Sequence, residues 1–213
     1  LASEQTTEIT LPTENLAIGT YEINVTAEIT NDTYSTNNSS RKTFSVNHLN
    51  ETPTTVNSFE NAEDALLSQN DLWELGTVNK TLLSTPNGQK AYATKLAGNH
   101  PDNTTGYLYT KYYNLSNVIN PILRFKMAFD IEQDWDYMIV EYSTDKGLNW
   151  NILGSANDAN WYNSSATSSP PPHNVPLPGK QWTGEGEDSN PLGGTNATSH
   201  NYSYDLASLQ SET

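Results

Sequence analysis

The amino-acid sequence predicts an all-β protein that is built from antiparallel β-sandwich modules. Apolar and polar residues alternate with a period of two in residues 16–30, which is typical of a strand with one buried face. From residue 90 to residue 153, short strand-like runs recur with turn residues between them, as in a sandwich or a barrel. Nothing repeats at a fixed period, so a solenoid or a propeller is not indicated.

The first part of the chain is expected to contain a β-hairpin. In the run LAIGTYEINVTAEIT, alternate apolar residues would share one buried face. A polar turn at residues 31–33 leads to the run Lys42–Val46, in which Phe44 and Val46 point the same way. The residues expected on the buried face of the first strand are Tyr21, Ile23, Val25, Ala27 and Ile29.

A domain boundary is predicted at residues 48–57. This segment, HLNETPTTVN, is polar, and its Pro53 lacks a backbone donor and favours an extended conformation at Thr52. We therefore expect one module in residues 1–47, a linker, and a second module in residues 58–213.

The second module is expected to be a larger sandwich with one short helix. Alternation in the run Ile122–Ile131 indicates a strand with one buried face. The run Asn61–Leu67 would form the helix, with Asn61 or Ser58 capping its free N–H groups. The expected strands are Lys90–Leu96, Gly106–Tyr113, Ile122–Ile131, Tyr137–Tyr142 and Asn149–Leu153, and the buried face of the third contains Leu123, Phe125, Met127, Phe129 and Ile131.

Composition excludes several classes of partner and site. Lys and Arg total 10 against 25 Asp and Glu, and the net charge of −15 would repel nucleic acid. The chain has no run of 18 apolar residues, so we expect no membrane insertion of this piece. Without cysteine it has neither a disulfide framework nor a thiolate metal site. Serine-nucleophile, P-loop and dinucleotide signatures are absent, which favours a non-catalytic function.

The sharpest local motif is STDKGLNW at residues 143–150, with the spacing S-x-D-x-G-x-x-W. Asp145 would accept hydrogen bonds from turn amides, Gly147 would take a positive φ, and Trp150 would fold back beneath the turn. The spacing resembles the Asp-box of sialidase propellers, where several copies occur and serve a structural role. A single copy favours a rigid hairpin over a sialidase.

The run LAIGTYEINVTAEITNDTYSTNN followed by KTFSV resembles the last strands of Ig-like (CARDB-type) adhesion modules, which lie between the domains of prokaryotic surface proteins. The resemblance implies that residues 1–47 are a partial Ig-like spacer or display module. An unrelated edge of two strands is the alternative interpretation.

Residues 105–154, TGYLYTKYYNLS to NWNILG, together with Ala159–Asn163, resemble the MAM-like jelly-roll modules of large bacterial secreted proteins. The resemblance covers about residues 57–209. It implies a jelly roll in residues 58–213 whose last strands lie beyond this piece, and a parent protein that uses the type IX secretion route. It also implies an extracellular or cell-surface location.

A structural Ca²⁺ is one interpretation of the hard oxygen ligands in this second module, and solvated loop carboxylates are the interpretation that the sequence favours. The expected ligands of the ion are Glu60, Asp134 and Asp136. Residues 134 and 136 would present both carboxylates on the same face of a strand. The four histidines are scattered without zinc-site spacing.

Recognition is expected in the long polar loop at residues 157–191, since loops on a rigid sandwich carry function. Its Trp161, Tyr162 and Trp182 are the candidates for stacking on sugar rings, although the sequence favours the interpretation that they pin the loop to the sheet.

The sequence therefore favours a non-catalytic adhesion or scaffold module. Its partners would be other modules of the same protein and a glycan or surface-protein ligand. The alternatives are an accessory domain of a secreted hydrolase, most simply a metalloprotease, and a carbohydrate-binding module. An H-E-x-x-H motif elsewhere in the parent gene would distinguish the protease.

Overall fold

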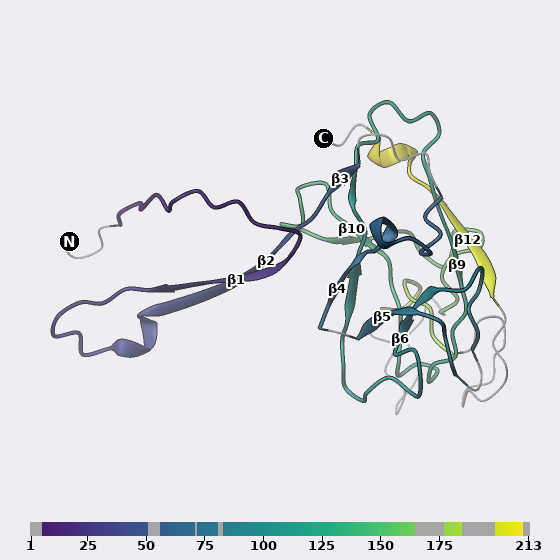
Figure 1. Cartoon of the computed structure of the whole chain (residues 1–213), viewed down its shortest axis with the longest axis horizontal. Helices are drawn as coiled ribbons and strands as arrows, with labels where there is room; N and C mark the ends of the chain where they lie inside the picture. Colours follow the sequence, from purple (N-terminus) through teal and green to yellow (C-terminus); the bar gives the residue numbers. More distant parts are fainter. Residues whose placement is uncertain are drawn as a thin grey trace. The chain divides into compact units, whose positions relative to one another are not determined.

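The computed structural model describes residues 6–50, 56–70, 72–80, 83–164, 177–184 and 199–210. Over these residues the regular structure consists of β-strands and three short 3-10 turns, and there is no α-helix (Figure 1). The all-β prediction is confirmed, and the paired strands fit a β-sandwich. Contacts along the chain divide it into two compact units, unit 1 (Leu1–His48) and unit 2 (Leu49–Thr213).

Unit 1 is a β-hairpin. It consists of β1 (Gly19–Thr26) and β2 (Ser39–Val46), and the connection between them contains the 3-10 turn η1 (Ser35–Asn37). The strands pair antiparallel along their whole length, with Tyr21 opposite Phe44. The predicted hairpin is therefore confirmed, and its second strand begins three residues earlier than expected.

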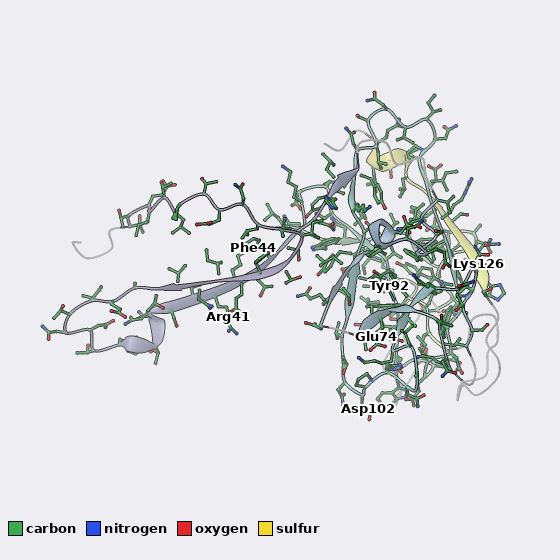
Figure 2. The ribbon with its side chains drawn as sticks, viewed as in Figure 1. Arg41, Phe44, Glu74, Tyr92, Asp102 and Lys126 are labelled. Atoms are coloured by element: carbon green, nitrogen blue, oxygen red, sulfur yellow. The ribbon has the colours of Figure 1, made fainter. Side chains whose placement is uncertain are left out.

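The two faces of this hairpin differ in chemistry. On one face the rings of Tyr21 and Phe44 stack with their centroids 5.9 Å apart. On the other face Nε of Arg41 lies 2.7 Å from the carboxylate of Glu22 and 3.3 Å from the side-chain oxygen of Asn24. Figure 2 labels Arg41 and Phe44 on β2. The alternation in the sequence thus separates an apolar face from a polar one.

The apolar stripe of the first strand is shorter than predicted. β1 ends at Thr26, so Ala27 and Ile29 lie beyond the strand, and Ile29 is 73% exposed. The chain turns here because the amide of Asp32 donates to the carbonyl of Ile29, and Asn31 takes a φ of +66°. Asn tolerates that left-handed conformation better than most residues.

Unit 2 contains the other strands, which pair two by two. Their bounds are β3 (Leu49–Asn50), β4 (Leu67–Gln69), β5 (Trp73–Gly76), β6 (Ala91–Thr94), β7 (Tyr107–Tyr109), β8 (Tyr112–Tyr113), β9 (Ile122–Met127), β10 (Glu141–Tyr142), β11 (Asn151–Ile152) and β12 (His200–Asp205). The pairs β4–β7, β5–β6, β9–β12 and β10–β11 are antiparallel, whereas β3–β8 is parallel. β3 lies within the segment that was expected to be a linker, and residues 51–55 of that segment lie outside the described residues.

Strands β6 to β11 all lie inside runs that the sequence predicted, but they are shorter. Along β9 exposed and half-buried residues alternate, as predicted, although the strand stops at Met127. The run Tyr137–Tyr142 contributes only β10 to a regular strand pair. Earlier in that run, the amide and the carbonyl of Met138 pair with the backbone of Trp182, 3.0 and 2.9 Å away.

The predicted helix at residues 61–67 is wrong. Only Ala62–Asp64 forms a single 3-10 turn, η2, and Leu67 already begins β4. Asn61 makes no side-chain cap bond, and Ala65 is extended, with φ −60° and ψ 139°. The carbonyl of Asp64 accepts instead from the side chain of Asn57, at 2.8 Å, which closes the turn before a helix can continue.

The core of unit 2 is largely aromatic. The ring of Trp182 is 1% exposed and lies 4.4 Å from the ring of Tyr162, centroid to centroid. Phe125 of β9 stacks at 5.5 Å on Tyr202, which is its partner in β12. Rings of this size bury a large apolar area, so they dominate the packing energy. The buried core residues are Phe129, Leu153, Trp161, Tyr162, Trp182 and Tyr202.

The indole N–H groups of this core are paired, and the backbone approaches it closely. Nε1 of Trp161 donates to the carbonyl of Leu153 at 2.8 Å, and Nε1 of Trp182 donates to the carbonyl of Trp161 at 2.9 Å. Gly154 has a φ of +77°, and a Cβ there would lie 2.5 Å from Cε2 of Tyr204. Only glycine fits this position without displacing a ring.

Candidate functional site

The turn between β10 and β11 is held together by the side chains of Ser143 and Asp145. The carboxylate of Asp145 accepts from the backbone amide of Asn149 at 2.9 Å and from its side-chain amide at 2.6 Å. The hydroxyl of Ser143 donates to Asp145 at 2.8 Å and accepts from the amide of Gly147 at 2.8 Å. The side chains therefore satisfy backbone donors that the tight turn leaves unpaired.

These hydrogen bonds stabilise the ionised form of Asp145. They lower the pKa of its carboxyl group from the ordinary 3.8 to about 2. The side-chain amide of Asn149 has the largest effect, followed by the backbone amide of Asn149 and the hydroxyl of Ser143. The shift has a structural cause, because every one of these partners belongs to the turn itself.

Gly147 and Trp150 complete the turn. Gly147 has a φ of +85°, and a Cβ at that position would lie 3.4 Å from the ring of Trp150. Nε1 of Trp150 donates to the carbonyl of Gly147 at 3.1 Å, so the indole folds back under the turn. The ring nevertheless remains 42% exposed.

Trp150 continues an aromatic row that begins on β7. Tyr107 and Tyr109 lie on the same face of that strand and stack with centroids 6.1 Å apart and ring planes 23° apart. The next contact joins Tyr109 to Trp150 at 5.6 Å. We call Tyr107, Tyr109 and Trp150 the aromatic row. Tyr107 is 43% exposed, so the row has free ring surface at both ends.

The strands around the row fix its position. The hydroxyl of Tyr109 donates to Oε1 of Gln69, at 2.8 Å, across the β4–β7 pair. The hydroxyl of Tyr112 donates to the carbonyl of Lys146, at 3.3 Å, which connects β8 to the turn. The rings therefore lie on a rigid scaffold and would lose little conformational entropy when a ligand binds.

A carboxylate lies close to this row. Glu141 is half-buried on β10 and lies opposite Ile152 of β11, which puts it on the same strand face as Trp150, two residues before Ile152. Burial raises the pKa of Tyr109 most, and Tyr107 and Glu141 raise it further. Among the described residues, the Glu141 side chain has no hydrogen-bond or ion-pair partner. The surface therefore combines ring faces with a carboxylate that pairs with no cation in the described part of the chain.

The three residues expected to stack on sugars lie in the core. Trp161 and Tyr162 are each 4% exposed and Trp182 is 1% exposed, so none has a ring face free for a ligand. The hydroxyl of Tyr162 accepts from the amide of Val140 at 2.9 Å and donates to its carbonyl at 3.1 Å. The alternative that these rings pin the loop to the sheet agrees with this geometry.

The described parts of the loop at 157–191 explain why these rings are buried. Residues 177–184 return to the core, where Thr183 exchanges hydrogen bonds with the side chain of Asn163, both at 2.9 Å. The hydroxyl of Thr183 also donates to the carbonyl of Asp136 at 2.8 Å. Polar contacts thus hold this segment beside the strands and close the core over Trp182. Residues 165–176 and 185–191 lie outside the described residues.

The carboxylates expected to bind Ca²⁺ contact different partners in the structure. Oε1 of Glu60 accepts from the amides of Gln89 and Lys90, at 2.8 and 3.0 Å. These bonds lower the pKa of Glu60, with Lys90 contributing most. Asp136 lies 3.1 Å from Nε2 of His100.

The expectation that residues 134 and 136 share one face of a strand is wrong. Both lie in a turn, in which the amide of Asp136 donates to the carbonyl of Glu132 at 2.9 Å, and Asp134 has a φ of +64°. The described residues contain no group of three or more His, Asp or Glu side chains that could hold a metal ion. They also contain no helix with the length and apolar character needed to cross a membrane.

The aromatic row was not predicted as a site from the sequence. The signal was present, because Tyr107 and Tyr109 are two residues apart in a strand-like run and must share a face. The contact of Tyr109 with Trp150, more than forty residues later, depends on how the strand pairs lie in the fold. Comparisons of the chain with known protein families, with curated proteins and with solved structures found no match.

Proposed function

We propose that this chain is a non-catalytic binding module of a larger secreted or cell-surface bacterial protein. The observation that carries the proposal is the aromatic row, in which Tyr107 and Tyr109 lie on the paired strand β7 and Trp150 lies in the hydrogen-bonded turn before β11. Large, rigid aromatic side chains are the residue types that supply most binding energy at protein surfaces.

The proposed location and parent protein are supported by the sequence resemblance to MAM-like and Ig-like modules. An arrangement of separate β-rich units is in keeping with proteins of that kind. Adhesion or scaffolding would then be the role of the whole protein, with the row as the part of this chain that contacts a ligand.

The lowered pKa of the Asp145 carboxyl group also supports a non-catalytic role. A catalytic carboxyl group needs a pKa near the working pH, whereas the pKa of Asp145 is about 2 and its partners are turn residues. The other large shift raises the pKa of Tyr162 to about 12, mainly through burial in the core. Both groups serve the structure of unit 2.

A ligand screen with matched variants tests the proposal. The full chain and the variants Tyr107→Ala and Tyr137→Ala would be applied to arrays of glycans and of surface-protein peptides. The two tyrosines are 43% and 44% exposed, so the variants remove similar surface from different places. We expect binding signals that Tyr107→Ala abolishes and Tyr137→Ala retains. Signals that survive Tyr107→Ala unchanged would contradict the role of the row.

A further inference from the structure

The aromatic row has the geometry of a cation-binding surface. The face of an aromatic ring carries negative potential and attracts an ammonium or guanidinium group within about 6 Å. The outer rings of the row, Tyr107 and Trp150, are 43% and 42% exposed. Tyr109 is half-buried and lies between them, 6.1 Å from one ring and 5.6 Å from the other, so the three rings form one contiguous cluster.

The carboxylate beside the row adds a full negative charge. Glu141 pairs with Ile152 across β10 and β11, so it shares a strand face with Trp150, two residues before Ile152. It has no ion-pair partner among the described residues. It is half-buried on β10, where water screens its charge less than at a fully exposed position. A cation that contacts the rings would therefore also gain an ionic interaction with Glu141.

The charge of the whole chain favours the same class of partner. With a net charge of −15, the protein attracts basic molecules over distances longer than a direct contact and repels acidic ones. Lys146, in the turn beside the row, is an exposed residue. Its carbonyl oxygen accepts a hydrogen bond from the hydroxyl of Tyr112.

We propose that the aromatic row and Glu141 form a docking site for a basic segment of a partner protein, whose Lys or Arg side chain lies on the ring faces and pairs with Glu141. The proposal rests on the function proposed above, because it names the class of ligand that the same surface binds. Arginine fits best, since its planar guanidinium stacks on rings and pairs with a carboxylate at the same time.

Fluorescence anisotropy with the full chain tests this site. The probe is a fluorescein-labelled peptide of alternating arginine and glycine, and the matched peptide has glutamine in place of arginine. At physiological ionic strength we expect the arginine peptide alone to bind. Tyr107→Ala and Glu141→Gln should each weaken its binding about threefold to tenfold, as expected for a cation–π contact and an ion pair at a partly exposed site.

Matched variants distinguish the site from general attraction to an acidic protein. Tyr137→Ala removes a tyrosine of similar exposure, and Glu132→Gln removes an exposed carboxylate outside the row, so both should leave the affinity unchanged. Equal weakening by all four variants, or no binding of the arginine peptide, would overturn the docking site.

A second arm separates failure of this inference from failure of the proposed function. Soluble neutral oligosaccharides would be titrated into the same proteins, with the change in total tryptophan fluorescence, to which the exposed Trp150 contributes, as the readout. Oligosaccharide binding that Tyr107→Ala abolishes, without arginine-peptide binding, would keep the binding module and overturn the basic partner. If neither probe binds in a way that depends on Tyr107, both proposals are wrong.

Discussion

Asp145 shows how one side chain can organise a turn without being buried. Its two oxygens accept from the amides of Asn149 and from the hydroxyl of Ser143, while Ser143 in turn accepts from Gly147. The short side chain of Asp places its oxygens within hydrogen-bonding distance of backbone amides a few residues further along the chain. The geometry of this turn therefore follows from the local sequence alone. The spacing of the motif is therefore sufficient to predict the turn.

The turn should respond to acid in a defined range. The carboxyl group of Asp145 has a lower pKa in the folded state, so its contribution to stability is complete above its ordinary pKa of 3.8 and is lost as the pH falls towards about 2. We expect the Asn149 amide resonance to titrate in this range in two-dimensional NMR. In Asp145→Asn that titration should be absent; if it persists, another group is responsible.

Tyr162 should make the core sensitive to alkali. Burial raises the pKa of its phenol to about 12. The contribution of Tyr162 to the stability of the folded state is therefore complete below the ordinary pKa of 10 and is lost as the pH rises towards 12. Removing the hydroxyl in Tyr162→Phe leaves the amide of Val140 without its partner, whereas the carbonyl of Val140 still accepts from the amide of Leu153 at 2.8 Å. The unpaired amide should cost about 1–3 kcal/mol at neutral pH. Urea denaturation across this pH range would measure both effects, with the exposed Tyr137→Phe as the control.

At the scale of elements, the close contact between Gly154 and the rings is the most demanding feature. A Cβ at this position would lie 2.5 Å from Tyr204 and 2.7 Å from Trp161, at a φ of +77°. Gly154→Ala should therefore destabilise unit 2 by about 1–3 kcal/mol, or more where the rings cannot move.

Gly98 supplies the matched control for this variant. It has a similar φ of +71°, but no atom lies within 4 Å of the position of a Cβ. Gly98→Ala measures the cost of backbone strain alone. The difference between the destabilisations obtained from the two melting curves is therefore the steric cost of Gly154→Ala. Equal destabilisation by both substitutions would show that the rings are free to move aside.

The positions of most strands could be predicted from the sequence, but their partners could not. Alternation along β1 and β9 marks their buried faces, because a strand packed on one side needs that pattern. The burial of Trp161 and Trp182 depends on the return of residues 177–184 to Met138, which no local pattern encodes. The helix at 61–67 failed for the related reason that pairing of β4 with β7 overrides a weak local preference.

The aromatic row is likewise a feature that could not be predicted from the sequence alone. Each ring is visible in the sequence, and the shared face of Tyr107 and Tyr109 follows from strand geometry. Its third member comes from the hairpin that the motif at 143–150 builds, and its carboxylate comes from β10. Such a surface can be assembled only when separate strand pairs have been placed beside one another.

At the scale of the whole molecule, the two units differ in how they are stabilised. Unit 2 has an aromatic core that several strand pairs share, whereas the described part of unit 1 is one strand pair with 39% of Phe44 and 51% of Val25 exposed. An isolated hairpin of two strands is at best marginally stable in water.

A peptide of residues 1–48 tests this contrast. We expect only partial β-structure by circular dichroism, a broad thermal transition, and amide protection factors below about tenfold, because local opening of such a hairpin costs little free energy. The matched peptide Phe44→Ala should lose most of the remaining signal. A sharp cooperative transition in the unsubstituted peptide would show that unit 1 has additional packing.

The unequal exposure of the tryptophans gives the protein two built-in optical reporters. Trp161 and Trp182 are sealed in the core, while Trp135 and Trp150 are 49% and 42% exposed. Emission from the sealed indoles will be blue-shifted and protected from collisional quenchers such as iodide, and emission from the surface indoles will be red-shifted and readily quenched. With Trp135 and the half-buried Trp73 both replaced by Phe, occupancy of the row can be followed in the quenchable fraction and loss of the fold in the protected one, from a single unlabelled sample.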